Sequence, residues 1–436
     1  MAELVQRYLD QICAEHAGCT EGELASYIPE LAGVNPDGFG MSLSSADGHV
    51  YESGDAATEF TIQSISKPLT YALALHQLGE AAVDARIGVE PSGEAFNEIS
   101  VDRTTKTPKN PMINAGAIAA VSLIQGADAD ERFECIRDFY SACAGRSLQL
   151  DEQVYRSEKA TGSRNRAIAY MLESFGILDG DPDEVLDVYF RQCSLLVTST
   201  DLARIGATLA RGGVNPMTGR RVTDNIVVQR TLSVMVTCGM YDAAGDWVTG
   251  VGLPAKSGVG GGIMAVLPGQ LGIGVYSPRL DAKGNSVRGV LVCRSLSRRL
   301  GLHFLTVSRE SRSTIRAVYE PVDNVRVYEI HGDLLFAGAE QVLRTVSREC
   351  GRLDVAVLDV SRLDTINDPA RELLASMSSA LRDQGKTGLL VDPDGAVIRV
   401  QHEFDAVSFT SIEDAVVEAQ RWLQEGRLPV GSDLDG

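Results

Sequence analysis

The strand-forming stretches of this chain fall into two groups far apart in the sequence, and that separation restricts the fold more than any other feature. Residues 38–43 and 49–52 flank Asp47-Gly48, a strong signal for a β-hairpin. Further short, glycine-flanked and β-branched stretches follow much later, at 259–267, 270–276 and 288–293. We expect these to return to the sheet that the hairpin begins, with a helical block inserted between the two groups. Such a chain has an α+β fold in one domain.

Helical periodicity dominates the remainder of this first part. Apolar residues recur at helical spacing over residues 4–17 and over about 113–212. We also expect helix over 22–27 and a last helix over 296–308. These patterns predict a first domain that comprises residues 1–308.

The composition changes after this domain. Residues 309–316 are polar and charged, which favours a linker over 309–321. A second, α/β domain is expected over 322–425, followed by a C-terminal tail over 426–436. Its expected strands are 325–330, 355–360, 388–391 and 397–400, and its expected helices are 338–349, 369–382 and 411–423.

Charge and composition exclude several classes of partner and site. The formal net charge of −19 repels nucleic acid and anionic membranes, so neither is expected as a general partner. The eight cysteines are scattered, without C-x-x-C spacing or a nearby histidine cluster, so we expect no disulfide framework and no metal site. No apolar run is long enough to span a bilayer, and the N-terminus lacks the pattern of a signal peptide. We therefore expect a cytoplasmic protein.

The main candidate for a catalytic site is a Ser-x-x-Lys pair, Ser64 and Lys67, at the point where an extended segment turns into a helix. Apolar residues at helical spacing follow, so the two side chains lie about one turn apart and can touch. A serine hydroxyl becomes a good nucleophile when a base takes its proton, and a neutral lysine can be that base if burial lowers its pKa. The structural alternative is a helix-capping serine beside a solvated lysine.

Further patches occur in order along the first domain. They hold Tyr27, Asn114, Glu158, Asn165, Tyr189, Tyr241 and Lys256. With these residues the chain resembles the serine-dependent glutaminases over roughly residues 4–305. The resemblance implies a β-lactamase/transpeptidase-like catalytic domain that hydrolyses L-glutamine to L-glutamate and ammonia without a cofactor.

The resemblance also implies roles for individual groups. Ser64 attacks the amide carbon, and Lys67 accepts its proton. Tyr241 relays a proton to the leaving group, and the backbone N–H groups of Ser64 and Val259 form the oxyanion hole. Water then hydrolyses the glutamyl-enzyme ester.

Specificity would come from the other end of the substrate. Glu158 is the expected partner of the α-ammonium group, and Gln63 is expected to shape the pocket. The resemblance assigns neutral hydrogen bonds to Tyr27, Asn114, Asn165 and Tyr189. Each has a structural alternative: the asparagines as turn or cap residues, the tyrosines as packed residues at a rim. Gly162 favours a loop between Glu158 and Asn165.

Lys256-Ser257-Gly258 resembles the Lys-Thr/Ser-Gly strand of β-lactamases. There the strand edge lines the site, and the charge of Lys256 would give electrostatic support by helping to keep Lys67 neutral. The alternative is a surface lysine on an edge strand.

The second domain, with its Asp359–Arg371 segment, resembles a STAS domain. In that family a phosphorylatable serine or threonine commonly begins the helix after this strand, and here that position is Asp368. An Asp followed by Pro is a good N-cap and first helical residue. We also hypothesise that the carboxylate mimics a permanently phosphorylated residue and makes this domain a fixed-state module for a protein partner.

Two other functions stay open at this point: an inactive, glutamine-binding regulatory protein, and a serine amidohydrolase for another γ-amide. The family resemblance favours a homodimer or homotetramer.

Overall fold

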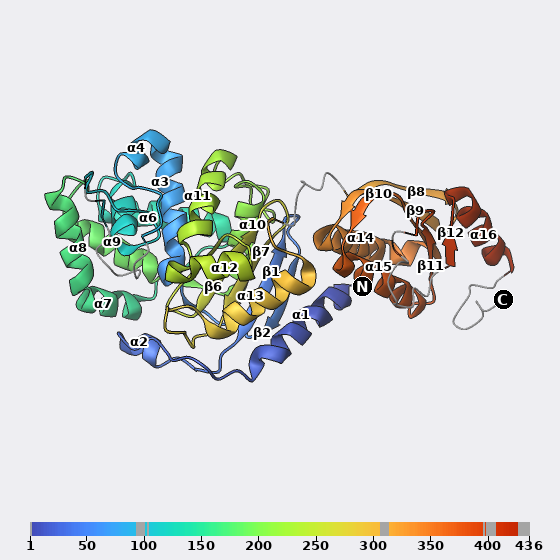
Figure 1. Ribbon diagram of the computed structural model, residues 1–436, viewed down its shortest axis with the longest axis horizontal. Helices are drawn as coiled ribbons and strands as arrows, with labels where there is room; N and C mark the ends of the chain where they lie inside the picture. Colours follow the sequence, from blue (N-terminus) through green and yellow to red (C-terminus); the bar gives the residue numbers. More distant parts are fainter. Residues whose placement is uncertain are drawn as a thin grey trace. The chain divides into compact units, whose positions relative to one another are not determined.

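The computed structural model describes residues 2–92, 101–102, 104–305, 314–395, 397 and 407–425, and it divides into two compact units (Figure 1). The larger unit comprises Leu9–Ser297 with His303–Leu305. The smaller unit comprises Met1–Tyr8, Arg298–Leu302 and Thr306–Gly436. Among the described residues, every helix is too short or too polar to cross a bilayer.

The larger unit is built on one antiparallel five-stranded sheet, in the order β2-β1-β7-β6-β5. Its strands are β1 (Gly40–Ser45), β2 (Val50–Gly54), β5 (Ala255–Ser257), β6 (Gly262–Leu267) and β7 (Leu271–Tyr276). The hairpin β1-β2 pairs with β7 from the far end of the sequence, Ser42 opposite Gly274. The predicted sheet from both ends of the domain is therefore confirmed.

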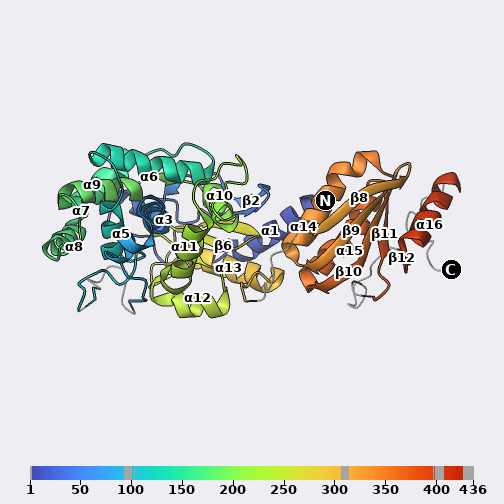
Figure 2. The same ribbon diagram turned by 90° about the horizontal axis from the view of Figure 1, so that it is seen from above.

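Helices cover both faces of this sheet (Figure 2). Helix α10 (Ser199–Ala210) packs on one face, where Gly206 meets Gly272 of β7. Helix α13 (Val287–Leu300) lies on the other face, with Gly289 against Ile263. The strand predicted over 288–293 is wrong because this segment belongs to α13. Its buried residues Val292 and Leu296 are four apart, which is helical spacing that the β-branched run concealed.

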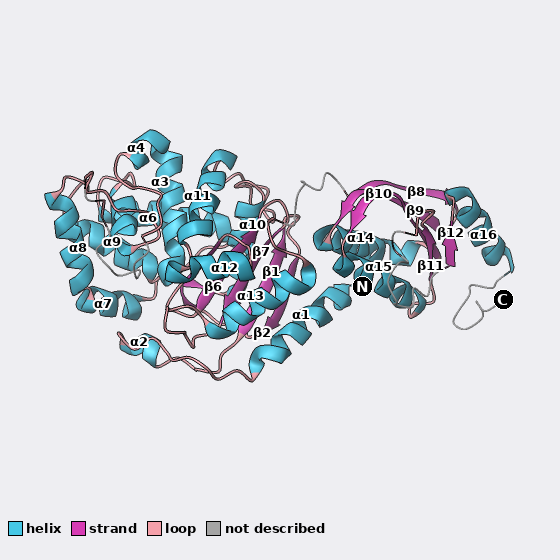
Figure 3. Ribbon diagram, in the orientation of Figure 1, coloured by secondary structure: helices cyan, strands magenta, loops and turns pink. Residues whose placement is uncertain are grey.

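The inserted block is helical, as predicted (Figure 3). It holds α3 (Ser66–Leu78), α4 (Glu80–Asp84), α5 (Asn114–Ser122), α6 (Ala129–Ala144), α7 (Glu152–Thr161), α8 (Ser163–Ser174), α9 (Pro182–Cys193), α11 (Asn225–Cys238) and α12 (Ala244–Gly250). Helix α3 is buried on all sides from Ser66 to Leu75. A short two-stranded pair, β3 (Phe60–Thr61) with β4 (Leu196–Val197), leads into it.

The N-terminal segment differs from its prediction. Helix α1 (Ala2–Ala17) is present, but residues 22–27 form no helix and precede a short α2 (Pro29–Ala32). Gly22 has a φ of +88°, and a Cβ there would lie 2.6 Å from the Leu280 carbonyl oxygen. Glu23 bridges to Leu280, so this segment is held as extended chain by a distant loop that local sequence cannot reveal.

The smaller unit has a mixed sheet in the order β12-β11-β10-β9-β8. Strands β9 (Val325–Leu334), β10 (Val355–Ile366), β11 (Thr387–Val391) and β12 (Val407–Phe409) are parallel, and β8 (Ile315–Val322) is antiparallel to β9. The helices are α14 (Phe336–Glu349), α15 (Asp368–Arg382) and α16 (Ile412–Glu425). The predicted α/β pattern is confirmed.

The boundaries of this unit differ from the predicted ones in two places. Residues 315–321, expected as linker, form most of β8, because their backbone pairs with β9. The N-cap of α15 is Asn367, whose side chain accepts a hydrogen bond from the Ala370 N–H, and Asp368 is the first residue of the helix. Three segments lie outside the described residues: 309–313 of the expected linker, 398–400 of the expected strand at 397–400, and the tail at 426–436.

Candidate active site

Ser64 lies in a single 3₁₀ turn, Gln63–Ile65, that runs directly into α3. The turn begins with Gln63 at a φ of +49°, in the left-handed region that residues other than glycine seldom adopt. Ser64 is 9% exposed, and Lys67 in the first turn of α3 is fully buried. The solvated-lysine alternative is therefore wrong, and the two residues lie one turn apart as the spacing predicted.

Lys67 is held by the amide of Asn114 in α5, which is in turn held by the amide of Asn165 in α8. Its Nζ donates to Asn114 Oδ1 at 2.6 Å, and Asn114 Nδ2 donates to Asn165 Oδ1 at 2.9 Å. Burial lowers the pKa of Lys67 to about 8, because desolvation disfavours the charged form. The neutral amine needed for a base is thus accessible near physiological pH.

Tyr241 approaches the same turn from the segment after α11. It has a φ of +56°, and its hydroxyl donates to the Ser257 carbonyl oxygen at 3.0 Å. Burial raises the pKa of Tyr241 to about 12, against hydrogen bonds with Ser64 and Ser257 that lower it. The phenol therefore keeps its proton at neutral pH while it contacts the Ser64 hydroxyl.

Lys256 lies beneath Tyr241 on β5. Its Nζ is 3.9 Å from the centroid of the Tyr241 ring and donates to the Ser257 carbonyl oxygen at 2.8 Å. The surface alternative is wrong because Lys256 is fully buried. Burial, and after it the charge of Lys67, holds the pKa of Lys256 well below its ordinary value. The pKa of Lys67 is lowered by its own burial.

The turn between β5 and β6 packs directly on the Ser64 turn. A Cβ at Gly258 would lie 3.0 Å from the Ile62 carbonyl oxygen and 3.4 Å from the Ser64 nitrogen. A Cβ at Gly260 would lie 2.6 Å from the Thr61 carbonyl oxygen. Glycines at both positions therefore allow the backbone around Val259 to approach the backbone of Ser64.

A second group of polar side chains surrounds Glu158, which is 7% exposed. Its Oε1 accepts from the Tyr27 hydroxyl at 2.7 Å and from Gln63 Nε2 at 3.1 Å. Burial raises the pKa of Glu158, although both hydrogen bonds oppose that change. Gln63 thus connects the carboxylate directly to the turn that carries Ser64.

The expected loop between Glu158 and Asn165 is wrong. Glu158 lies in α7 and Asn165 in α8, and Gly162 is the junction between the two helices. A Cβ at Gly162 would lie 2.3 Å from the Phe190 ring, so the glycine is explained by close packing on α9. Tyr189 on α9 is 4% exposed and adjoins this group. Burial, and then charges that include Glu158, raise its pKa well above the ordinary value.

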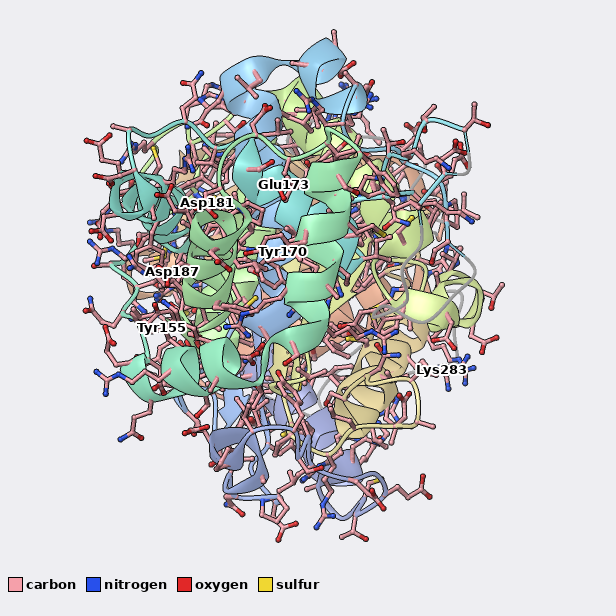
Figure 4. The ribbon with its side chains drawn as sticks, turned by 90° about the vertical axis from the view of Figure 1, so that its left-hand side faces the viewer. Tyr155, Tyr170, Glu173, Asp181, Asp187 and Lys283 are labelled. Atoms are coloured by element: carbon pink, nitrogen blue, oxygen red, sulfur yellow. The ribbon has the colours of Figure 1, made fainter. Side chains whose placement is uncertain are left out.

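An ionic cluster on the outer face joins α7 to α9. Asp187 accepts from the Tyr155 hydroxyl and from Lys159 Nζ, each at 2.5 Å. Arg191 also pairs with Asp187, at 2.8 Å. Figure 4 labels Tyr155 and Asp187 on this face. The cluster holds the helix of Glu158 against the helix of Tyr189. No spacing in the sequence indicates it, because its members come from two separate helices.

Two family models match the chain. The model described as Glutaminase matches residues 22–305, and the model described as STAS domain matches residues 316–419. The chain belongs to the glutaminase family. The predicted catalytic-domain resemblance and the predicted STAS resemblance are both confirmed.

Similar glutaminases come from several bacteria. Glutaminase 2 of Bradyrhizobium diazoefficiens is 47% identical over 88% of this chain, which spans 65% of that relative. The glutaminase of Corynebacterium efficiens is 43% identical over 89% of this chain and 92% of its own length. The glutaminase of Microcystis aeruginosa is 50% identical over 70% of this chain and 91% of its own length.

Solved structures are also similar to this chain. "Crystal Structure Analysis of Mglu" is 44% identical and covers 89% of this chain and 98% of that chain, with a TM-score of 0.69. "Crystal Structure Analysis of Mglu in its glutamate form" is 40% identical over 89% of this chain and 98% of that chain, also with a TM-score of 0.69. "Probable glutaminase ybaS" is 43% identical over 70% of this chain and 98% of that chain, with a TM-score of 0.68.

Proposed function

We propose that this glutaminase-family chain hydrolyses the side-chain amide of free L-glutamine to L-glutamate and ammonia through a glutamyl ester on Ser64. The observation that carries the proposal is a fully buried Lys67, with a pKa of about 8, one turn from Ser64. A lysine desolvated in this way is a competent base for a serine hydroxyl.

The first step makes the ester. Neutral Lys67 removes the Ser64 proton, and the hydroxyl oxygen attacks the amide carbon of the substrate. Asn114 accepts one N–H of the lysine amine at 2.6 Å, which orients the nitrogen and leaves its lone pair for Ser64. The N–H groups of Ser64 and Val259 stabilise the oxyanion of the tetrahedral intermediate.

Collapse of this intermediate breaks the carbon–nitrogen bond. Tyr241 donates its proton to the departing nitrogen, and the proton held by Lys67 restores the phenol. The high pKa of Tyr241, about 12, keeps the phenol protonated until ammonia leaves. Lys256 supports this step by holding the Tyr241 ring and the Ser257 carbonyl in place. Water then attacks the ester, releases L-glutamate and returns the proton to Ser64.

The amino end of glutamine fits the Glu158 group. The α-ammonium pairs with Glu158, while Tyr27, Asn114, Asn165 and Tyr189 supply neutral hydrogen bonds to the α-carboxylate and the amino end. The similar Mglu structure in its glutamate form supports a site for this product. Capping the amine would remove the cation that pairs with the buried Glu158 carboxylate, which costs binding energy.

Substrate comparison tests this function. We expect ammonia release from L-glutamine, with turnover of L-asparagine and N-acetyl-L-glutamine lower by at least about a hundredfold. The shorter side chain of L-asparagine misplaces the amide at Ser64, and the acetyl group removes the cation that pairs with Glu158. Equal turnover of L-asparagine, whose amide is one methylene closer to the α-carbon, would favour a serine amidohydrolase of broader amide specificity. Glutamine binding without turnover of any amide would favour the regulatory protein.

We also propose a cytoplasmic homodimer or homotetramer. All eight cysteines are free thiols, which fits a reducing compartment. Light scattering on the purified chain tests the assembly, and a monomer at all concentrations would refute it. Fractionation of the producing cell tests the location.

For the STAS domain we propose a protein partner that recognises the Asp368 carboxylate as a permanent substitute for a phosphate group. Asp368 is 77% exposed in its side chain and pairs with Arg371 at 2.6 Å, so its carboxylate is available at the surface.

A further inference from the structure

A buried polar network surrounds Ser66, two residues after Ser64. The Ser66 hydroxyl donates to the Gln63 carbonyl oxygen at 2.6 Å. Gln192 of α9 donates from its Nε2 to Ser66 Oγ at 3.3 Å. Gln192 Oε1 accepts from the Thr70 hydroxyl at 2.6 Å. These side chains are fully buried, so water cannot replace any of the bonds.

Helix α6 joins the same network. The Tyr140 hydroxyl, also fully buried, lies 2.8 Å from the Ser66 carbonyl oxygen and 2.6 Å from the Thr70 hydroxyl, and it can donate to either. The side chain and the main chain of Ser66 are therefore fixed from two helices of the inserted block. Buried polar groups that are satisfied in this way specify one local geometry.

The carbonyl group that Ser66 holds belongs to Gln63, which has an unusual backbone conformation. Gln63 has a φ of +49°, a conformation that persists in a residue with a Cβ only where the surroundings impose it. This residue precedes the nucleophile, and its side chain donates to Glu158 at 3.1 Å. One backbone conformation at Gln63 thus sets the direction of the Ser64 hydroxyl and the position of the Glu158 contact together.

We infer that Ser66 is a positioning residue. Its hydroxyl fixes the left-handed conformation of Gln63, and Gln63 connects Ser64 to Glu158, the proposed partner of the α-ammonium group. The inference rests on the proposed function, because the two ends of glutamine define what must be aligned. Ser66 touches no substrate atom in this account. Its effect comes through Gln63.

Ser66→Ala tests the inference, with Ser122→Ala as a matched control. Ser122 is buried in α5 and makes the same bond to a carbonyl three residues back, to Ala119 at 2.8 Å. We expect Ser66→Ala to lower kcat about tenfold and to raise the inhibition constant of L-glutamate several-fold, because misalignment by small shifts is costly in catalysis. Ser122→Ala removes the same kind of bond without taking an acceptor from Gln192, so it should lower the Tm less than Ser66→Ala and leave both constants unchanged.

A double-mutant cycle separates positioning from a merely structural role. In a Gln63→Gly background the left-handed φ carries no Cβ penalty, so Ser66→Ala should cost less than about twofold there. A tenfold cost in both backgrounds, or full activity of Ser66→Ala alone, would overturn the inference. Absence of glutamine turnover in the wild type would refute the proposed function, and the inference with it.

Discussion

Lys67 makes catalysis depend on pH in a defined direction. Its pKa of about 8 in the folded protein lies below the ordinary lysine value, so the amine is protonated and inactive as a base below about pH 8. We predict that kcat/KM for L-glutamine rises about tenfold per pH unit up to roughly pH 8 and then levels. A flat profile between pH 6 and pH 8, with the fold intact by circular dichroism, would contradict this role. Lys67→Arg should be inactive throughout, since a guanidinium stays protonated.

Glu158 is predicted to act on binding more than on chemistry. Glu158→Gln removes the charge that pairs with the α-ammonium, and a hydrogen bond to a charged group contributes about 1.5–3 kcal/mol. We expect KM for L-glutamine to rise roughly 10–100-fold, with a smaller change in kcat.

Glu30→Gln is the control for Glu158. Glu30 is a neighbouring carboxylate that accepts from Ser157 of α7 at 2.9 Å, whereas the hydrogen bonds from Tyr27 and Gln63 go to Glu158. The control should leave KM near the wild-type value. If both substitutions raise KM equally, general negative charge explains the effect and the specific pairing is wrong.

At the scale of residues, the sequence could predict which side chains lie close together along one helix, but not the burial or the distant hydrogen-bond partners of each side chain. Ser64 and Lys67 were found because helical spacing places them one turn apart. The network of Ser66, Tyr140 and Gln192 could not be found, because its members are joined across 74 and 126 positions of sequence. The burial of Lys256 could not be predicted either, since an exposed edge strand and a covered strand can have the same local sequence pattern.

At the scale of elements, the contact of α10 with the sheet depends on glycines of β7. A Cβ at Gly272 would lie 2.2 Å from the Ala203 carbonyl oxygen and 2.3 Å from the Ala207 nitrogen. Gly272→Ala must therefore push the helix off the strand, and we predict a loss of at least about 1–3 kcal/mol in the free energy of unfolding.

Gly245→Ala is the control for this packing. Gly245 lies in α12 with nothing within 4 Å of its Cβ position, and alanine there should stabilise by roughly 0.5–1 kcal/mol through helix propensity. Urea denaturation measures both variants. Unchanged stability of Gly272→Ala would show that the helix can retreat without cost.

The element predictions succeeded where periodicity was local. The β1-β2 hairpin and the α/β alternation of the smaller unit follow from turn residues and apolar spacing. The strand prediction for 288–293 was wrong because short β-branched runs occur in strands and in helices. The helix prediction for 22–27 was wrong because a bridge to the distant Leu280 determines the conformation of this segment. A tertiary contact therefore determined 22–27, whereas the local pattern of 288–293 was ambiguous.

At the scale of the whole molecule, every group assigned to catalysis and binding comes from residues 27–259 of the larger unit. We predict that a chain ending at Leu305 keeps kcat/KM within about twofold of the full chain, because a domain with its own core folds alone. The Microcystis aeruginosa glutaminase, matched over 91% of its length by 70% of this chain, supports that expectation. A tenfold loss with the same Tm would instead give the STAS domain a part in catalysis.

The central claim is that Ser64 is the nucleophile of a glutaminase, and ammonia release from L-glutamine by wild type and Ser64→Ala tests it most directly. Ser64 is small and 9% exposed, so the variant should fold normally and bind L-glutamate. We predict turnover by the wild type and a loss of at least about 10³-fold in kcat for Ser64→Ala, the scale typical of removing a nucleophile. Equal turnover by the two proteins would contradict the account.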